Sequence, residues 1–96
     1  MATYNVHSCT HQTLSANTVD VVNTDASFAS YRITHRGTLG VGTIFVRTDG
    51  TDPEANGDDN YRVAPGEEKF IPSGSYAQVR LICTSGIAYS VEGHHA

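Results

Sequence analysis

The sequence predicts an all-β protein, a single small sandwich or barrel of short antiparallel strands. Valine, isoleucine and threonine number 9, 5 and 11, whereas leucine, methionine, lysine, glutamate and glutamine together number only 11. β-branched residues fit a pleated surface and the second group fits a helix, so this ratio excludes a helical bundle. Nine glycines and three prolines indicate frequent turns, and 96 residues form one domain, residues 1–96.

Alternating apolar and polar side chains predict four strands in the first half of the chain. In the second of these strands Val19 and Val21 should point inward, and in the fourth Ile44 and Val46 should do so. The four strands should span residues 3–10, 18–22, 28–35 and 43–48. Between the last two, the glycine-rich residues 37–42 form a hairpin loop. They do not match a phosphate-binding loop, because they precede a strand and do not open a helix.

Four further strands follow a long polar loop. They should span residues 61–63, 69–71, 76–83 and 87–91. Pro65-Gly66 and Ser85-Gly86 are turn signals between them. Seven or eight short strands at roughly ten-residue spacing are typical of an antiparallel sandwich or small barrel, immunoglobulin-like or jelly-roll-like. Residues 94–96 should be a flexible tail.

The charge balance bears on partners and location. The net charge is −4, with ten carboxylates against six cations, whereas nucleic acid needs a basic surface. No stretch approaches the ~20 apolar residues that cross a bilayer, and the first residues do not resemble an export signal. We expect no nucleic acid and no membrane as partners, and we expect the protein to be made in a cytosol. Cys9 and Cys83 should then be reduced thiols, and whether they lie close together stays open.

The polar loop at residues 49–60 suggests a calcium site. It holds five carboxylates within eleven residues, and its alternating oxygen ligands followed by Gly57 match the start of a calcium-binding loop. The twelfth position is Val63, where such a loop needs a bidentate glutamate. A solvated hairpin loop would have the same composition, because these residue types favour turns. The candidate calcium ligands are Asp49, Asp52, Glu54, Asn56 and Asp58.

A second metal hypothesis concerns His7, Cys9 and His11, which would share one face of the first predicted strand. Imidazole and thiolate bind zinc. Neighbours on one strand face are ~6.5–7 Å apart, however, which is too wide for three ligands on one ion. The alternative is an exposed polar row.

The sequence predicts that the chain is not an enzyme. No serine lies in a nucleophile-elbow context, and no pair of carboxylates is placed by its spacing. A sandwich of this size also has little room for a pocket that excludes water.

Five of the six cations are arginines, and several should lie on one outer sheet face. Guanidinium groups on a rigid sheet are suited to carboxylates of another protein, and interface centres favour aromatic residues and arginine. Ordinary surface charge that guards sheet edges is the alternative. The candidate interface residues are Phe45, Arg47, Arg62, Arg80 and Ile82.

Four segments resemble small β-sandwich virion structural proteins of tailed actinobacterial phages. They are GTIFVRTDGTDP at 42–53, GDDNYRVAPG at 57–66, VRLIC at 79–83 and AYSVEG at 88–93. The resemblance spans about residues 18–93. It implies a capsid decoration protein on the virion's capsid surface, bound to the major capsid protein as a homotrimer or another symmetric cluster. Residues 1–13 lie outside it and would be an N-terminal arm that pairs with a neighbouring chain.

Two other functions stay open on the sequence. One is a head–tail connector or tail-associated module with the same sandwich. The other is a carbohydrate-binding or cell-surface-binding module, assisted by calcium through residues 49–59. Such modules display exposed aromatic platforms, and the chain has no tryptophan.

Overall fold

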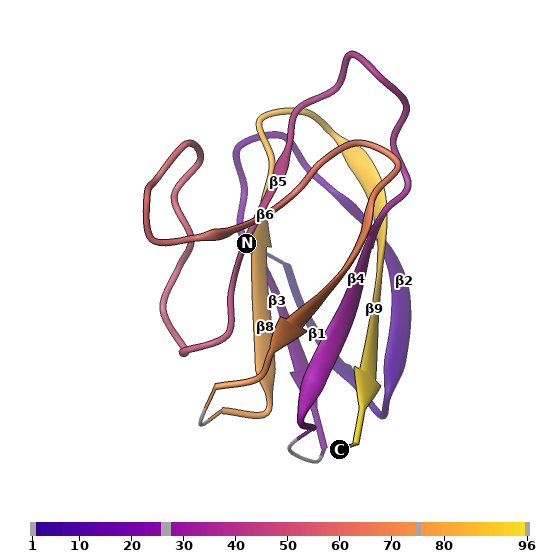
Figure 1. Cartoon of the computed structure of the whole chain (residues 1–96), viewed down its shortest axis with the longest axis vertical. Helices are drawn as coiled ribbons and strands as arrows, with labels where there is room; N and C mark the ends of the chain where they lie inside the picture. Colours follow the sequence, from indigo (N-terminus) through magenta and orange to yellow (C-terminus); the bar gives the residue numbers. More distant parts are fainter. Residues whose placement is uncertain (1, 26–27, 75, 96) are drawn as a thin grey trace.

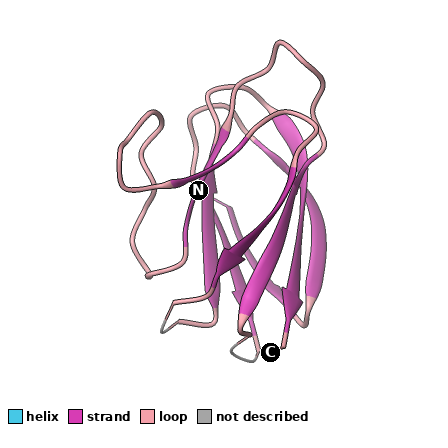
Figure 2. Ribbon diagram, in the orientation of Figure 1, coloured by secondary structure: helices cyan, strands magenta, loops and turns pink. Residues whose placement is uncertain are grey.

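Nine strands form two facing sheets in the computed structural model, which describes residues 2–25, 28–74 and 76–95 (Figures 1 and 2). The described residues contain no helix, so the predicted all-β sandwich is confirmed. The strands are β1 (Ala2–Val6), β2 (Cys9–Leu14), β3 (Asp20–Thr24), β4 (Ser30–His35), β5 (Ile44–Arg47), β6 (Tyr61–Val63), β7 (Glu68–Pro72), β8 (Gln78–Ile82) and β9 (Ile87–His94).

The two sheets divide the strands in a way that is not sequential. The first sheet has the order β1-β3-β8-β5-β6, and the second has the order β2-β9-β4-β7. All pairs are antiparallel except β1 and β3, which run parallel. Each sheet therefore turns one face to the other sheet and one face outward, which is the arrangement that period-two alternation predicts.

The single first strand predicted for residues 3–10 is wrong, because the chain changes sheet at His7 and Ser8. β1 pairs with β3, and β2 pairs with β9 in the opposite sheet. Tyr4, Val6 and Leu14 all pack on the core and all have even numbers. The alternation therefore continues through the corner and gives no sign of it. The predicted arm is folded onto its own domain.

Between the sheets, the alternation predicted for β4, β5, β8 and β9 is confirmed. Tyr31, Ile44, Leu81 and Tyr89 are all fully buried. The prediction for β3 is wrong by one residue, since Val22 takes the core face and Val21 lies on the outer face opposite Arg80. The side chain that joins Val22 on the core face is a carboxylate, Asp20.

Asp20 and Tyr89 form a polar bridge between the sheets. The Tyr89 hydroxyl donates a hydrogen bond to Asp20 Oδ2 at 2.8 Å, and both side chains are buried, with exposures of 0% and 2%. Burial raises the pKa of Asp20, and the hydrogen bond from Tyr89 opposes that rise. Burial and the neighbouring carboxylate raise the pKa of Tyr89 as well. This pair links β3 of one sheet to β9 of the other across the core.

The antiparallel arrangement gives the sandwich two ends with different loops. The turns after β2, β4, β6 and β8 lie at one end, and the turns after β1, β3, β5 and β7 lie at the other (Figure 1). The long loop after β5, residues 48–60, projects at the left in Figure 1. It folds back toward the outer face of the first sheet.

Candidate functional site

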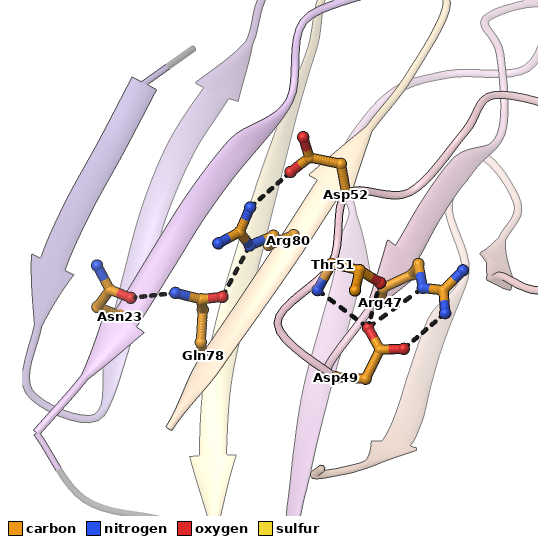
Figure 3. A network of polar contacts seen from close by, with 7 residues as sticks. All are labelled: Asn23, Arg47, Asp49, Thr51, Asp52, Gln78 and Arg80. Atoms are coloured by element: carbon orange, nitrogen blue, oxygen red, sulfur yellow. Dashed lines mark hydrogen bonds and ion pairs between the residues drawn. The ribbon is translucent and has the colours of Figure 1, made fainter. Parts of the chain in front are cut away.

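The outer face of the first sheet carries the predicted interface residues, and it brings two arginines together. Arg47 on β5 and Arg80 on β8 are direct cross-strand partners. Like charges opposite each other destabilise a sheet. Each arginine is instead matched with a carboxylate from the 48–60 loop, as Figure 3 shows. The register of β5 and β8 therefore explains why an acidic loop lies beside this face.

Asp49 is the carboxylate of Arg47. Arg47 Nε and Nη2 donate to the two Asp49 oxygens at 3.2 and 2.6 Å, a bidentate pair. The Thr51 amide and hydroxyl add hydrogen bonds to Asp49 Oδ1 at 3.1 and 2.6 Å. Arg47, and to a lesser degree Thr51, hold the pKa of Asp49 well below its usual range. Asp49 thus fastens the start of the loop to the end of β5.

Asp52 is the carboxylate of Arg80, and it draws the loop across to β8. Arg80 Nη1 donates to Asp52 Oδ1 at 2.6 Å, and Arg80 Nε donates to Gln78 Oε1 at 2.7 Å. A row of amides continues from there, because Gln78 donates to Asn23 at 2.7 Å (Figure 3). Asn23 in turn donates to Asn5 at 3.2 Å. The guanidinium of Arg80 is held from both sides.

Phe45 lies on the outer face of the first sheet, but its side chain is only 3% exposed. The Arg62 guanidinium lies 5.4 Å from the Phe45 ring centroid, a cation–π contact. Ile82, the cross-strand partner of Phe45, is half-buried. Pro53 in the loop is buried too. Arg62 therefore covers the Phe45 ring, the aromatic part of the predicted interface.

Several of the candidate calcium ligands are occupied by contacts within the loop and with the sheet. Asp49 and Asp52 are engaged by arginines, and among the described residues no three His, Cys, Asp or Glu side chains gather closely enough to hold an ion. Glu54 contributes its carbonyl oxygen, which accepts a hydrogen bond from the Gly57 amide at 2.9 Å. Asn56 has a positive φ of 62°. The acidic loop is a set of turns clamped by arginine.

The predicted His7, Cys9 and His11 row is divided by the corner between β1 and β2. His7 is paired with Asp25, whereas His11 Nδ1 lies 2.6 Å from Ser90 Oγ on the outer face of the second sheet. In the part of the chain that the structure describes, these three side chains do not gather into a group that could hold a metal ion. Cys9 is exposed and has no disulfide partner.

The other cysteine and the C-terminal histidines are also placed. Cys83 is buried and forms no disulfide with Cys9. The predicted tail begins within a strand, because β9 extends to His94. The His94 ring contacts Phe70 at a centroid distance of 5.3 Å, and the His95 ring contacts Phe28 at 4.8 Å. Residue 96 lies outside the described residues.

A hollow of about 420 Å³ opens beside the loop. Its polar groups Arg47 and Asp49 are already bonded to each other. Asn60 donates through Nδ2 to the Glu54 carbonyl oxygen at 2.7 Å, while its buried Oδ1 has no partner. The remaining lining residues are Val46, Thr48, Asp59, Tyr61, Pro72, Ser73 and Gly74.

The sequence reasoning missed the loop of residues 36–43 as a feature of interest. Leu39 at its tip is 91% exposed, more than any other large apolar side chain among the described residues. His35 is buried at the base, where Nδ1 accepts a hydrogen bond from the Gly37 amide at 3.0 Å. His35 Nε2 therefore carries the proton and donates to the Gly42 carbonyl at 2.8 Å. A leucine between glycines in a turn was the available signal.

The sequence matches no model of a known protein family, and neither the curated proteins nor the solved structures compared with it give a match. Within the described ranges, no helix has the length and hydropathy needed to cross a membrane.

Proposed function

We propose that this chain is a structural protein of a phage virion, a decoration protein that binds the assembled head and stabilises it. The resemblance of residues 42–53, 57–66, 79–83 and 88–93 to virion structural proteins supports this assignment. The structural observation that supports it is that the charged side chains of the first sheet's outer face pair with one another. Arg47, Arg80, Asp49 and Asp52 neutralise one another and close the surface of a small sandwich. Such a module is suited to binding a rigid scaffold.

The mechanism is mass action. A protein that binds the assembled shell and not the free subunits opposes disassembly, and repeated sites on one lattice add avidity when the protein is itself a symmetric cluster. The major capsid protein is the partner in this proposal, and a homotrimer is the favoured assembly. A head–tail connector is the alternative role for the same sandwich.

Copy number tests the proposal. Purified chain is mixed with heads of its own phage that lack it, sedimented and quantified per particle by gel densitometry. A copy number that scales with the number of capsomers supports decoration. Copies sufficient for a single ring support the connector. No co-sedimentation would refute both roles.

A carbohydrate-binding module is the second candidate, and the hollow beside the loop favours it. Tyr61 lines this hollow and is 44% exposed, and the buried Asn60 Oδ1 is an acceptor that a sugar hydroxyl can satisfy. A panel of neutral oligosaccharides, titrated while the amide resonances are followed by NMR, tests this function. Shifts confined to residues around the hollow support it, and unchanged spectra at millimolar sugar refute it.

A further inference from the structure

One end of the sandwich contains no charged residue in four neighbouring loops. We name this surface the neutral end and define it as residues 14–19, 37–43, 64–66 and 83–86. Asp20, Arg36 and Glu67 stand at its border, and the acidic 48–60 loop lies along the outer face of the first sheet, where Arg47 and Arg80 hold it (Figure 1). The charged loop residues of this part of the molecule therefore lie outside the neutral end.

Hydrogen bonds join the four loops of the neutral end into one surface. The Asn17 amide donates to the Cys83 carbonyl at 2.8 Å, and the Gly42 amide donates to Ser85 Oγ at 3.2 Å. The Gly66 amide donates to the His35 carbonyl at 3.2 Å. The loops are therefore fixed relative to one another, which reduces the ordering cost of binding.

Leu39 is presented at the top of this surface by a defined turn, the magenta loop at the top of Figure 1. The Val41 amide lies 3.4 Å from the Thr38 carbonyl oxygen, and Gly40 has a positive φ of 101°. These features are those of a type II turn with Leu39 at its second position. Turn tips usually carry Gly, Pro, Asn, Asp or Ser, whereas this tip carries a leucine that is 91% exposed.

The base of the loop is rigid. His35 holds Gly37 and Gly42 through its two ring nitrogens. A Cβ at Gly42 would lie only 2.5 Å from Thr84 Oγ1, so the loop packs closely on the turn after β8. The exposed Leu39 side chain is therefore held in one position by a rigid loop before any partner binds.

We propose that the neutral end, with Leu39 as its anchor, is the surface that docks on the shell subunit. This inference rests on the proposed decoration function and replaces the arginine face as its contact. Nucleic acid and anionic lipid both require cations, which the neutral end lacks. Burying uncharged loops incurs no charge desolvation, and the centres of protein interfaces are depleted of charge. The complementary occupant is an uncharged, apolar socket on a protein.

The test compares three proteins for binding to purified heads of the phage that lack the chain. Leu39→Asp places a charge on the anchor. Phe70→Asp places the same charge on β7, where Phe70 is 60% exposed, far from the turn tip in the chain. Both side chains are exposed, so both variants should fold, and circular dichroism and melting verify this. Occupancy is measured by co-sedimentation over a range of protein concentrations and at two salt concentrations.

We expect Leu39→Asp to weaken binding about tenfold or more, as loss of a central anchor does, and Phe70→Asp to bind like the wild type. Wild-type binding should change little with salt, since uncharged contacts are not screened. Equal binding by Leu39→Asp and wild type, with wild type bound, would overturn the neutral end and leave the decoration function standing. Equal weakening by both variants would also overturn it. A wild type that never binds heads would refute the function and the inference together. Size-exclusion light scattering that shows Leu39-dependent self-association without head binding would make a second copy the occupant and overturn the shell as partner.

Discussion

Replacing Tyr89 with phenylalanine should destabilise the protein through one lost hydrogen bond. The substitution removes the hydroxyl that donates to Asp20 Oδ2 at 2.8 Å and leaves the carboxylate, which is 2% exposed, without that donor. Hydrogen bonds to charged groups contribute about 1.5–3 kcal/mol, and a buried acceptor left unmatched costs a similar amount. We expect a loss of about 2–3 kcal/mol in the free energy of unfolding at pH 7. For a domain of this size that is roughly 10–20 °C in Tm.

The pH dependence separates this effect from simple loss of packing. The folded state raises the pKa of Asp20 above its ordinary value of 3.8. A carboxyl of this kind contributes most stability below the unfolded pKa, and the contribution is lost as pH rises through the folded pKa. Without the Tyr89 hydroxyl the pKa of Asp20 rises further. The difference between wild type and Tyr89→Phe should therefore be larger at pH 7 than at pH 4.

Urea denaturation followed by circular dichroism at pH 4 and pH 7 measures both quantities. Asp20→Asn is the matched control, because the amide oxygen can still accept from Tyr89 while the charge is gone. At pH 7, introducing Tyr89→Phe into the Asp20→Asn variant should lower the free energy of unfolding less than introducing it into the wild type does. A loss below about 0.5 kcal/mol for Tyr89→Phe, a value usual for surface changes, would refute the reasoning. An equal loss at both pH values would refute it too.

Three further predictions concern the loop, the turn packing and the thiols. Asp49→Asn should lower the urea midpoint of unfolding slightly at pH 7, because the lowered pKa of Asp49 makes its ionised form stabilising above about pH 4. Added salt should reduce this effect, and an unchanged midpoint at low salt would contradict the prediction. Gly42→Ala should cost about 1–3 kcal/mol by overpacking, since its Cβ would lie 2.5 Å from Thr84 Oγ1, and adding Thr84→Ala should restore stability in urea titrations. Cys9 should react with an aromatic disulfide reagent in the native protein, whereas Cys83 should react only in denaturant; one fast thiol in buffer and two in urea is the expected count, given one exposed and one buried cysteine.

The sequence predicts which side of a strand a residue occupies better than it predicts which distant residue that side chain contacts. Alternation correctly assigned the inward residues of four strands because a period of two depends only on neighbours in the chain. It missed the corner after Val6, where the parity of inward residues is unchanged, and it misplaced Val21, because Asp20 is a polar residue on a core face. A buried carboxylate has no local signal, since its partner Tyr89 is 69 residues away.

The arginine face of the first sheet shows how charges within one chain can pair with each other. The sequence predicts that Arg47 and Arg80 bind carboxylates of another protein, and that the acidic loop binds a cation. Both expectations treated the two charge clusters as separate, although a loop that begins at the end of β5 holds its carboxylates at high effective concentration beside them. Intramolecular pairing needs no association entropy, so it wins over a partner unless that partner offers much more. Opposite charges that one loop brings together are therefore already paired and less available to a partner. The contact with a partner is better sought on a surface without charged side chains. In this chain that reasoning leads to Leu39 and the loops around it.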